Sequence, residues 1–281
     1  MENIFFERHD MYPLASNAHF YLRHYVRGSW AIPDTSPRYH PILRMPVNRM
    51  FFPLRNPNGE ANYIVDSKRK YILEERHLYF IPAEYPVNIQ VDSELYFLSL
   101  HFNLELYPGV DLFAYCHNML DIPKPSCLEP LLELIDSTPE ELPFSALKVK
   151  GLTEAYVSDL GKYYPKDDFQ ELLMLGNYVS LLGYLKKEGN ARTRVSDLSA
   201  QVGESREAFT RKFTAKTKLT PKALIDRILL GKAIELLRRN HSVKETASEL
   251  RFSSEFVFSS FFKRCTGSSP FHWIRQMHQF H

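Results

Sequence analysis

The sequence predicts an α+β protein. An N-terminal β-sandwich or jelly-roll barrel precedes a helical linker and an all-α C-terminal domain with two helix-turn-helix motifs joined by a long helix. Three observations predict this fold class. Short apolar segments, separated by prolines and turn residues, run through the first 103 residues. A 21-residue pattern occurs twice near the C-terminus, 49 positions apart. The last 92 residues are basic, whereas the rest of the chain is acidic.

Apolar alternation marks the strands of the N-terminal part. Residues 56–59, Asn-Pro-Asn-Gly, are a turn signal between two of them. Short strands at regular spacing, with prolines confined to the breaks, are typical of sandwiches and jelly rolls. The expected strands cover residues 18–30, 39–45, 49–54, 61–65, 70–73, 77–81, 87–91 and 95–103.

Apolar stripes at helical spacing predict three helices between the two parts, over residues 126–137, 144–162 and 168–187. These helices either pack on the β part or pair with a second subunit. The expected division of the chain is a β domain over residues 1–125, a linker or dimerisation segment over 126–170, and the helix-turn-helix domain over 171–281.

The repeated pattern spans residues 205–225 and 254–274, which are identical at six of 21 positions. Each copy has a serine N-cap, two phenylalanines four residues apart, and a proline at the first position of the next helix. We assign all four phenylalanines to the core. The identities are Ser205/Ser254, Phe209/Phe258, Phe213/Phe262, Thr217/Thr266, Pro221/Pro270 and Ile225/Ile274.

A short helix is expected before each copy. The first covers residues 195–202, with Ser196 as its N-cap and Gly203 just after its end. The second starts at Ser242, where Glu245 completes a capping box. A helix, a turn and a capped second helix make up the DNA-binding helix-turn-helix pattern.

The two copies differ in their turns. The second turn is one residue longer, so that Arg251 corresponds to Gly203, and Lys218 stands where the second copy has Gly267. A positive φ at these positions would cost a side chain about 1 kcal/mol. Between the motifs, residues 221 to about 240 are expected to form one joining helix with an apolar stripe.

Charge distinguishes a DNA-binding module from an all-helical packing module. Residues 190–281 contain 17 Lys and Arg against 8 Asp and Glu, a net charge of +9, which leaves −7 for residues 1–189. A basic, repeated helix-turn-helix supplies the cations that neutralise the phosphates of a duplex. We therefore expect double-stranded promoter DNA as a partner.

From about Leu172 to Arg275 the sequence resembles the AraC/XylS family of bacterial transcription regulators. The resemblance implies that each recognition helix enters an adjacent major-groove segment on one face of the DNA. It also implies an N-terminal, cupin-like effector domain that binds a small molecule. The matching elements are residues 195–198, 205–213, Arg227, Ala233 and the run 261–270 (FFKRCTGSSP), with a weaker match at 78–84 (LYFIPAE).

In the first recognition helix, the resemblance assigns Arg206, Glu207, Thr210 and Arg211 to the groove, opposite the phenylalanine stripe. The planar guanidinium of Arg211 can bind a guanine edge in a bidentate way. The alternatives for Arg211 are a phosphate contact or an ion pair with Glu207.

The second recognition helix presents a different set: Glu255, Phe256, Ser259, Ser260 and Lys263. An acidic side chain is repelled by phosphates unless it accepts from a cytosine, and a phenyl ring offers only apolar contact. Lys263, with Arg264 beside it, can clamp the DNA backbone. We expect the first motif to read most of the sequence and the second to supply positioning and affinity.

By resemblance to sugar-responsive members, Phe97, Ser99 and His101 would line the inner face of the effector domain, with Asn88 and Arg27 from neighbouring strands. Each has a structural alternative, since Phe97 fits a core, His101 a satisfied buried histidine, and Arg27 an internal ion pair. The aromatic fraction of 14% favours a carbohydrate-like or planar effector only slightly.

An enzyme is the main alternative for the N-terminal domain. Metal-dependent cupins need clustered ligands, typically a His-x-His pair, and residues 1–135 contain no such pair. The three cysteines form no CxxC spacing. We expect no cofactor, no metal and no catalytic residue. The alternatives are a cupin-type enzyme or sugar-binding protein tethered to nucleic acid, and a ligand-independent regulator. The scattered histidines are His9, His19, His24, His40, His77, His101 and His117.

The resemblance further implies a homodimer on two half-sites, with RNA polymerase as a partner if the chain activates transcription. No apolar run approaches the length of a membrane span. Residues 1–8 (MENIFFER) lack the basic start and apolar core of a signal peptide. The sequence therefore predicts a cytoplasmic protein with no membrane partner.

Overall fold

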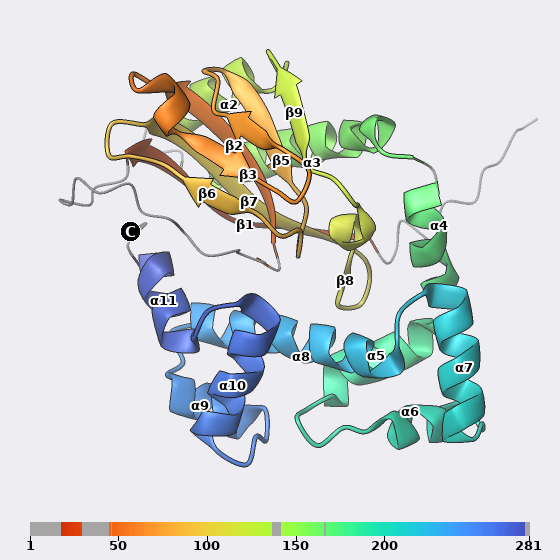
Figure 1. Cartoon of the computed structure of the whole chain (residues 1–281). Coiled ribbons are helices and arrows are strands. Elements are labelled where there is room, and N and C mark those ends of the chain that lie inside the picture. Colours follow the sequence, from red (N-terminus) through yellow and green to blue (C-terminus); the bar gives the residue numbers. More distant parts are fainter. Residues whose placement is uncertain (1–17, 30–44, 46, 137–141, 166, 279–281) are drawn as a thin grey trace, which may run out of the picture.

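A computed structural model of the chain places a β domain against a layer of helices (Figure 1). The structure describes residues 18–29, 45, 47–136, 142–165 and 167–278. The fold is a mixed α/β fold with the sheets in the N-terminal region and the helix-turn-helix motifs in the C-terminal region.

The strands of the described residues form two antiparallel sheets. The larger has the order β1-β7-β2-β5-β9 with β8 paired to β7, and the smaller has the order β4-β3-β6. The two sheets do not join into one closed barrel in the part of the chain that is described. The strands are β1 (His19–Ser29), β2 (Asn48–Arg55), β3 (Tyr63–Val65), β4 (Lys70–Ile72), β5 (His77–Ile81), β6 (Asn88–Gln90), β7 (Tyr96–Tyr107), β8 (Val110–Asp111) and β9 (Leu120–Pro123).

Apolar alternation located seven of these strands, and two were missed. The missed strands are β8, which has only two residues, and β9, whose four residues end in a proline at the edge of the sheet. The predicted strand at 39–45 lies outside the described residues except for Met45.

Strand β7 separates two apolar cores because successive side chains point to opposite faces. Leu98, Leu100 and Phe102 pack with α2 (Leu128–Ile135) and α3 (Leu142–Asp159) on one face. Phe97 lies on the other face, in the cluster between the two sheets. Any ligand held between the sheets must therefore contact this second face.

The predicted single helix at 168–187 is wrong. Helix α4 (Asp167–Met174) ends in a 3₁₀ turn, Leu175–Tyr178, before α5 (Val179–Glu188) begins. A Cβ added to Gly176 would lie 2.8 Å from the Tyr107 hydroxyl. This close approach to the sheet domain is made where the α-helix is interrupted.

The remaining helices form the two motifs, and none of the described helices is long and apolar enough to cross a membrane. The predicted Ser196 cap is wrong, because Arg194 occupies the N-cap position and its N–H donates to the Asp197 carboxylate at 2.8 Å. The helices are α6 (Val195–Gln201), α7 (Arg206–Thr217), α8 (Pro221–Arg238), α9 (Val243–Glu249), α10 (Glu255–Thr266) and α11 (Pro270–His278).

Two apolar clusters hold the motifs, and their membership differs. The cluster around the first motif combines Phe209 and Phe213 of α7 with Tyr107, Val110 and Tyr115 of the sheet domain. In the cluster around the second motif, every buried residue comes from positions 229–273. The first motif therefore shares its core with the sheet domain, and the second has a core of its own.

Candidate DNA interface and effector site

Each recognition helix is capped by the serine that the repeat predicts. Ser205 Oγ accepts from the N–H of Ala208 and Ser254 Oγ accepts from the N–H of Val257, each at 3.2 Å. The paired phenylalanine rings lie 5.5 Å apart in α7 and 5.8 Å apart in α10, and all four are buried. The opposite faces of both helices therefore point away from the core.

The turns adopt the left-handed conformation expected from the alignment of the two copies. Gly203 and Arg251 have φ of 67° and 57°, and Lys218 and Gly267 have φ of 54° and 80°. The predicted positive φ at Arg251 and Lys218 is confirmed. Two side chains thus occupy positions where the other copy carries glycine.

The outward face of α7 presents the four residues assigned to it. Arg206, Glu207 and Arg211 are exposed and Thr210 is half-buried. Among the described residues, Arg211 forms no ion pair with Glu207, and its neighbour Lys212 instead pairs with Glu204 at 2.8 Å. The Arg211 guanidinium is therefore available to a ligand.

The outward face of α10 is also exposed, but its chemistry differs. Phe256 is 80% exposed, Glu255, Ser260 and Lys263 are exposed, and Ser259 is half-buried. Its most prominent side chain is therefore apolar.

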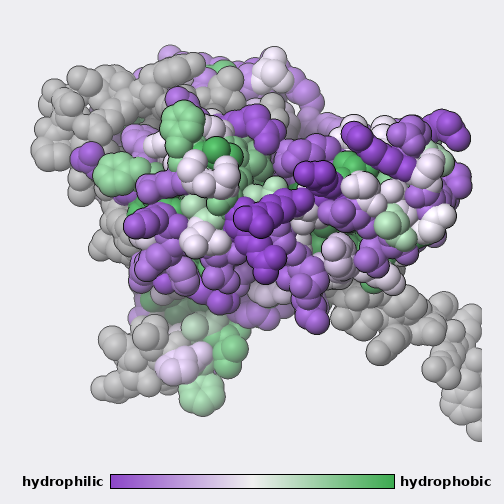
Figure 2. Space-filling view, turned by 90° about the horizontal axis from the view of Figure 1, so that it is seen from below, coloured by the Kyte–Doolittle hydropathy of each residue, from purple (hydrophilic) through white to green (hydrophobic). Residues whose placement is uncertain are grey.

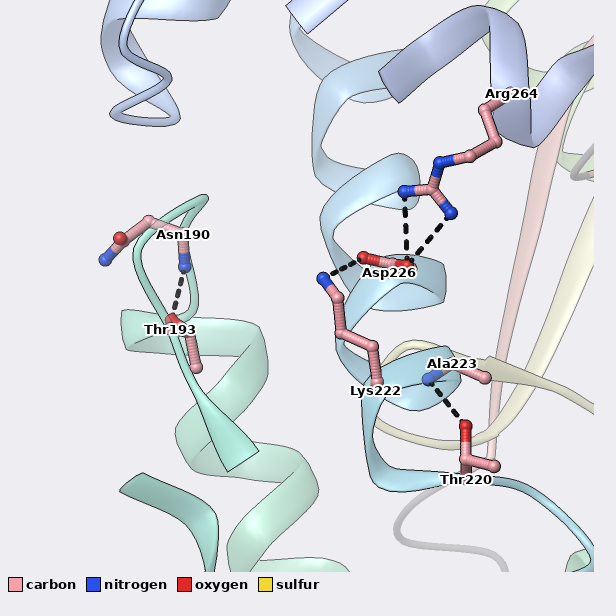
Figure 3. Close-up of polar contacts among 7 residues, drawn as sticks. All are labelled: Asn190, Thr193, Thr220, Lys222, Ala223, Asp226 and Arg264. Carbon is pink, nitrogen blue, oxygen red and sulfur yellow. Dashed lines mark hydrogen bonds and ion pairs between the residues drawn. The ribbon is translucent and has the colours of Figure 1, made fainter. Parts of the chain in front are cut away.

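Arg264 ties α10 to the joining helix. Its Nη1 and Nη2 each lie 3.3 Å from Asp226 Oδ2, while Lys222 Nζ lies 2.6 Å from Asp226 Oδ1 (Figure 3). Arg264 remains 61% exposed. The expected backbone clamp is thus partly engaged in holding the two helices together.

The two motifs lie at opposite ends of α8 (Figure 1). Figure 2 shows that mainly hydrophilic residues cover the molecule when it is seen from below, from the side of the helical domain. A rigid joining helix with a motif at each end fixes the separation of the two recognition helices.

Three of the five predicted effector residues gather between the sheets. Phe97, Ser99 and His101 are 3%, 4% and 7% exposed on the inter-sheet side of β7, where His101 Nε2 lies 3.1 Å from Ser99 Oγ. Asn88 is half-buried on β6 of the smaller sheet. Ser99 and His101 are thus polar groups in an otherwise apolar core, whereas Asn88 alternates with the core residues Val87 and Ile89 and points to the other face of the smaller sheet.

Arg27 does not join them. It pairs with Leu98, which belongs to the core on the helix side of the larger sheet, and it forms an ion pair with Asp136 just after α2. This hydrogen-bonded partner raises the pKa of the Arg27 guanidinium. The structure thus provides the ion pair that was the alternative for Arg27.

Sequence reasoning missed Arg49 of β2, which is 8% exposed. It lies opposite His101 on one side and Ile81 on the other, and so faces the space between the sheets. Burial lowers the pKa of its guanidinium to about 10. A basic residue among the apolar residues of NRMFFPLR was the only signal of it in the sequence.

Sequence reasoning also missed the buried carboxylate of Asp111. Asn48 Nδ2 donates hydrogen bonds to both of its oxygens. The carboxylate also accepts from Asn103 Nδ2 and from the N–H groups of Leu104 and Phe113, and all five donor–acceptor distances are 2.9–3.1 Å. This network connects β2, β7 and β8 at the side of the sheet that faces the helical domain.

The sheet domain and the joining helix meet through polar contacts around a cavity of about 280 Å³. Arg227 Nη2 of α8 lies 3.1 Å from Glu84 Oε2, and its guanidinium carbon lies 5.3 Å from the centre of the Tyr115 ring. Lys186 Nζ of α5 lies 2.6 Å from Glu105 Oε2. The cavity lining includes Arg23, Lys186, Lys232 and Arg238.

Within the described residues, no three His, Cys, Asp or Glu side chains gather as a metal site would require. Cys116 and Cys127 are buried, Cys265 is half-buried, and all three are free thiols. Burial raises the pKa of Cys127 to about 12 and that of Cys265 to about 11, which disfavours the reactive thiolate at neutral pH.

A family model described as a helix-turn-helix domain matches residues 198–276. The fold is similar to that of ToxT from Vibrio cholerae O395, with 14% identity over 92% of this chain and 97% of that one, and a TM-score of 0.56. Wild-type ToxT from V. cholerae strain SCE256, bound to an unsaturated fatty acid, gives 14% identity, 92% and 94% coverage, and a TM-score of 0.53. The DNA-binding domain of AdpA, solved with a target DNA, is 26% identical over 34% of this chain and 88% of its own, with a TM-score of 0.32. No curated protein matches the chain significantly.

Proposed function

The C-terminal part of this chain is an AraC-type helix-turn-helix domain in a ToxT-like fold, and from that premise we propose a transcription regulator that binds promoter DNA and responds to a small molecule. The observation that carries the proposal is the pair of capped recognition helices at the two ends of α8. Both expose the face opposite their buried phenylalanines.

In the proposed DNA complex, α7 reads sequence and α10 positions the protein. Arg211 is exposed and not paired with Glu207, so its fork can reach a guanine edge, and Arg206 lies five residues before it at the start of the same helix. On α10, Lys263 reaches phosphates, Ser259 and Ser260 contribute hydrogen bonds, Glu255 limits the choice of base, and Phe256 contacts a thymine methyl.

The proposed effector site lies between the two sheets of the N-terminal domain. Ser99 and His101 place hydrogen-bonding groups there, and Phe97 provides an apolar wall. Asn88 is left out of this site because it alternates with the core residues Val87 and Ile89 and so points to the other face of the smaller sheet. ToxT is an example of this fold with a small organic ligand bound. We propose that this site binds the effector and does not catalyse a reaction.

Effector binding would act on DNA binding through the contact between the sheet domain and α8. Arg227 joins Glu84 and Tyr115 at this contact, and α8 carries a motif at each end. A ligand that binds one arrangement of the two domains more tightly than the other increases the population of the arrangement that it prefers. The fraction of protein in the DNA-binding arrangement then changes with the difference between the two affinities.

We also propose a homodimer that acts in the cytoplasm on two half-sites. Support for the dimer comes from α3, where Phe144 and Leu147 are 68% and 64% exposed and so leave apolar area uncovered. RNA polymerase would be a further partner if the regulator activates transcription.

Selection from random duplex pools at two salt concentrations tests the proposal. Wild-type protein should enrich one sequence motif, and its affinity should fall steeply as the salt concentration rises. Arg211→Ala should lower the discrimination between the preferred base and the others at one position of the motif by about 1–3 kcal/mol. The matched control is Arg55→Ala, which removes an exposed arginine from the sheet domain. Binding without motif enrichment, in the presence and absence of candidate effectors, would refute sequence-specific regulation.

A further inference from the structure

Arg49 is a buried cation in an apolar setting. It is 8% exposed, and its strand neighbours on the same face are Ile81 of β5 and His101 of β7. Phe51, two positions along β2, belongs to the same inter-sheet core as Ile81. A guanidinium placed here has lost most of its water.

No described residue forms a hydrogen bond or an ion pair with Arg49, and its Nε is buried without a partner. Burial alone lowers the pKa of Arg49, to about 10, and the group therefore stays charged at neutral pH. A buried charge without a counter-charge is costly, and folded proteins normally pair it.

Three acids of this domain are committed to other partners. Asp66 accepts from the hydroxyls of Tyr71 and Tyr85, Asp111 accepts from two asparagines, and Glu84 pairs with Arg227. Among the residues that the structure describes, none supplies Arg49 with an anion. The partner that would complete this site is an external one.

The surroundings of Arg49 suit the carboxylate of a small apolar acid. Its guanidinium offers two parallel N–H donors, which match a carboxylate in a bidentate way. His101 and Ser99, two residues apart on β7, form a polar pair beside Arg49, and the aromatic rings of Phe51 and Phe97, whose centres lie 4.9 Å apart, provide an apolar wall.

We infer that the effector is an organic acid whose carboxylate binds Arg49 between the two sheets. The inference rests on the proposed function, since it names the chemical class of the effector and the residue that anchors it. Arg27, which lies on the other face of the larger sheet, has no part in this site.

Thermal unfolding and calorimetric titration of the full chain test the inference, with octanoate and benzoate as probes and octanamide and benzamide as neutral counterparts. The carboxylates should raise the unfolding temperature and the amides should not. Arg49→Met should remove the response, and the control Arg27→Met should keep it. If Arg49→Met does not fold, Arg49→Lys keeps the charge without the fork and should weaken carboxylate binding about tenfold.

A wild-type protein that responds to neither carboxylate overturns the inference, as does an Arg49→Met protein that keeps the response. Stabilisation by inorganic phosphate but by neither carboxylate overturns the assignment to an organic acid. Duplex selection with the same preparations separates the two proposals. An enriched motif without carboxylate binding refutes only the role of Arg49, whereas no motif at all refutes the regulator.

Discussion

Arg227 of the joining helix lies 3.1 Å from Glu84, so that one ion pair connects the helix between the two DNA-binding motifs to the sheet domain. Their side chains are 17% and 30% exposed, which places the pair mostly out of water. The carboxylate, together with Tyr115, raises the pKa of Arg227 despite its burial. The contact therefore favours one arrangement of the two domains.

Arg227→Met should lower the free energy of unfolding by about 2–4 kcal/mol, because it leaves the Glu84 carboxylate partly buried and unpaired. Urea unfolding measures the effect. The matched control is Arg239→Met, which breaks an exposed pair with Glu235 in the same helix and should cost less than about 1 kcal/mol. Adding Glu84→Gln to Arg227→Met should recover part of the loss. Equal costs for the two arginines would contradict a structural role for the pair.

Arg251→Gly should be more stable than Arg251→Ala by about 1 kcal/mol, because only glycine adopts a φ of 57° without strain. Both variants remove the same exposed charge, so the comparison isolates the backbone. Thermal unfolding of the two proteins is the measurement. Equal stability would mean that the longer turn relaxes when its side chain is removed.

Asp226→Asn should loosen α10 without unfolding the protein, since it removes the negative charge that pairs with Arg264 and Lys222 and leaves one acceptor oxygen in place of two (Figure 3). Hydrogen exchange should become faster in α10 and remain unchanged in α7. Glu235→Gln, which breaks the exposed pair with Arg239 in α8, is the control. If the protection of α10 from hydrogen exchange is the same in the wild type and in both variants, the apolar core alone positions α10.

Asp111 should make stability depend on pH. Burial raises its pKa from the ordinary 3.8 to about 6, so the folded protein binds this proton more tightly than the unfolded chain does. The resulting stabilisation is full below about pH 4 and is lost as the pH rises through 6. Asp111→Asn lacks this titration, and its amide NH₂ group meets the N–H donors that the carboxylate accepted from. Urea unfolding should therefore show a larger difference between wild type and Asp111→Asn at pH 5 than at pH 7.5, and parallel profiles would refute the shift.

The helical domain could be predicted from the sequence because its signals are local. Caps, glycine turns and phenylalanines four residues apart depend on neighbours within one helix, and the left-handed φ of Arg251 followed from aligning the two copies. The sequence did not predict the break between α4 and α5, where Gly176 closely approaches the distant Tyr107.

The inter-sheet site was harder to predict because strand pairing decides which face each residue occupies. The register shifts between Leu22 and His24 of β1, and Arg27 lies opposite Leu98 rather than with Ser99 and His101. Arg49 joins the inter-sheet face only because β2 pairs with β7 in the observed register. Such pairings link residues some 50 positions apart, and the sequence alone carries no local sign of them.

The shared core of the first motif means that the helical domain is not a freely exchangeable module. A fragment starting at residue 167 would retain α4, α5 and every buried residue around α10 but lose Tyr107, Val110 and Tyr115 from the cluster around α7. When this fragment is grafted onto another sensor, its second motif would remain intact, but the side of the first motif that packs on the sheet domain would be exposed to water. Evolution of a new sensor on this scaffold must therefore preserve the segment from the end of β7 to Tyr115 along with the helices.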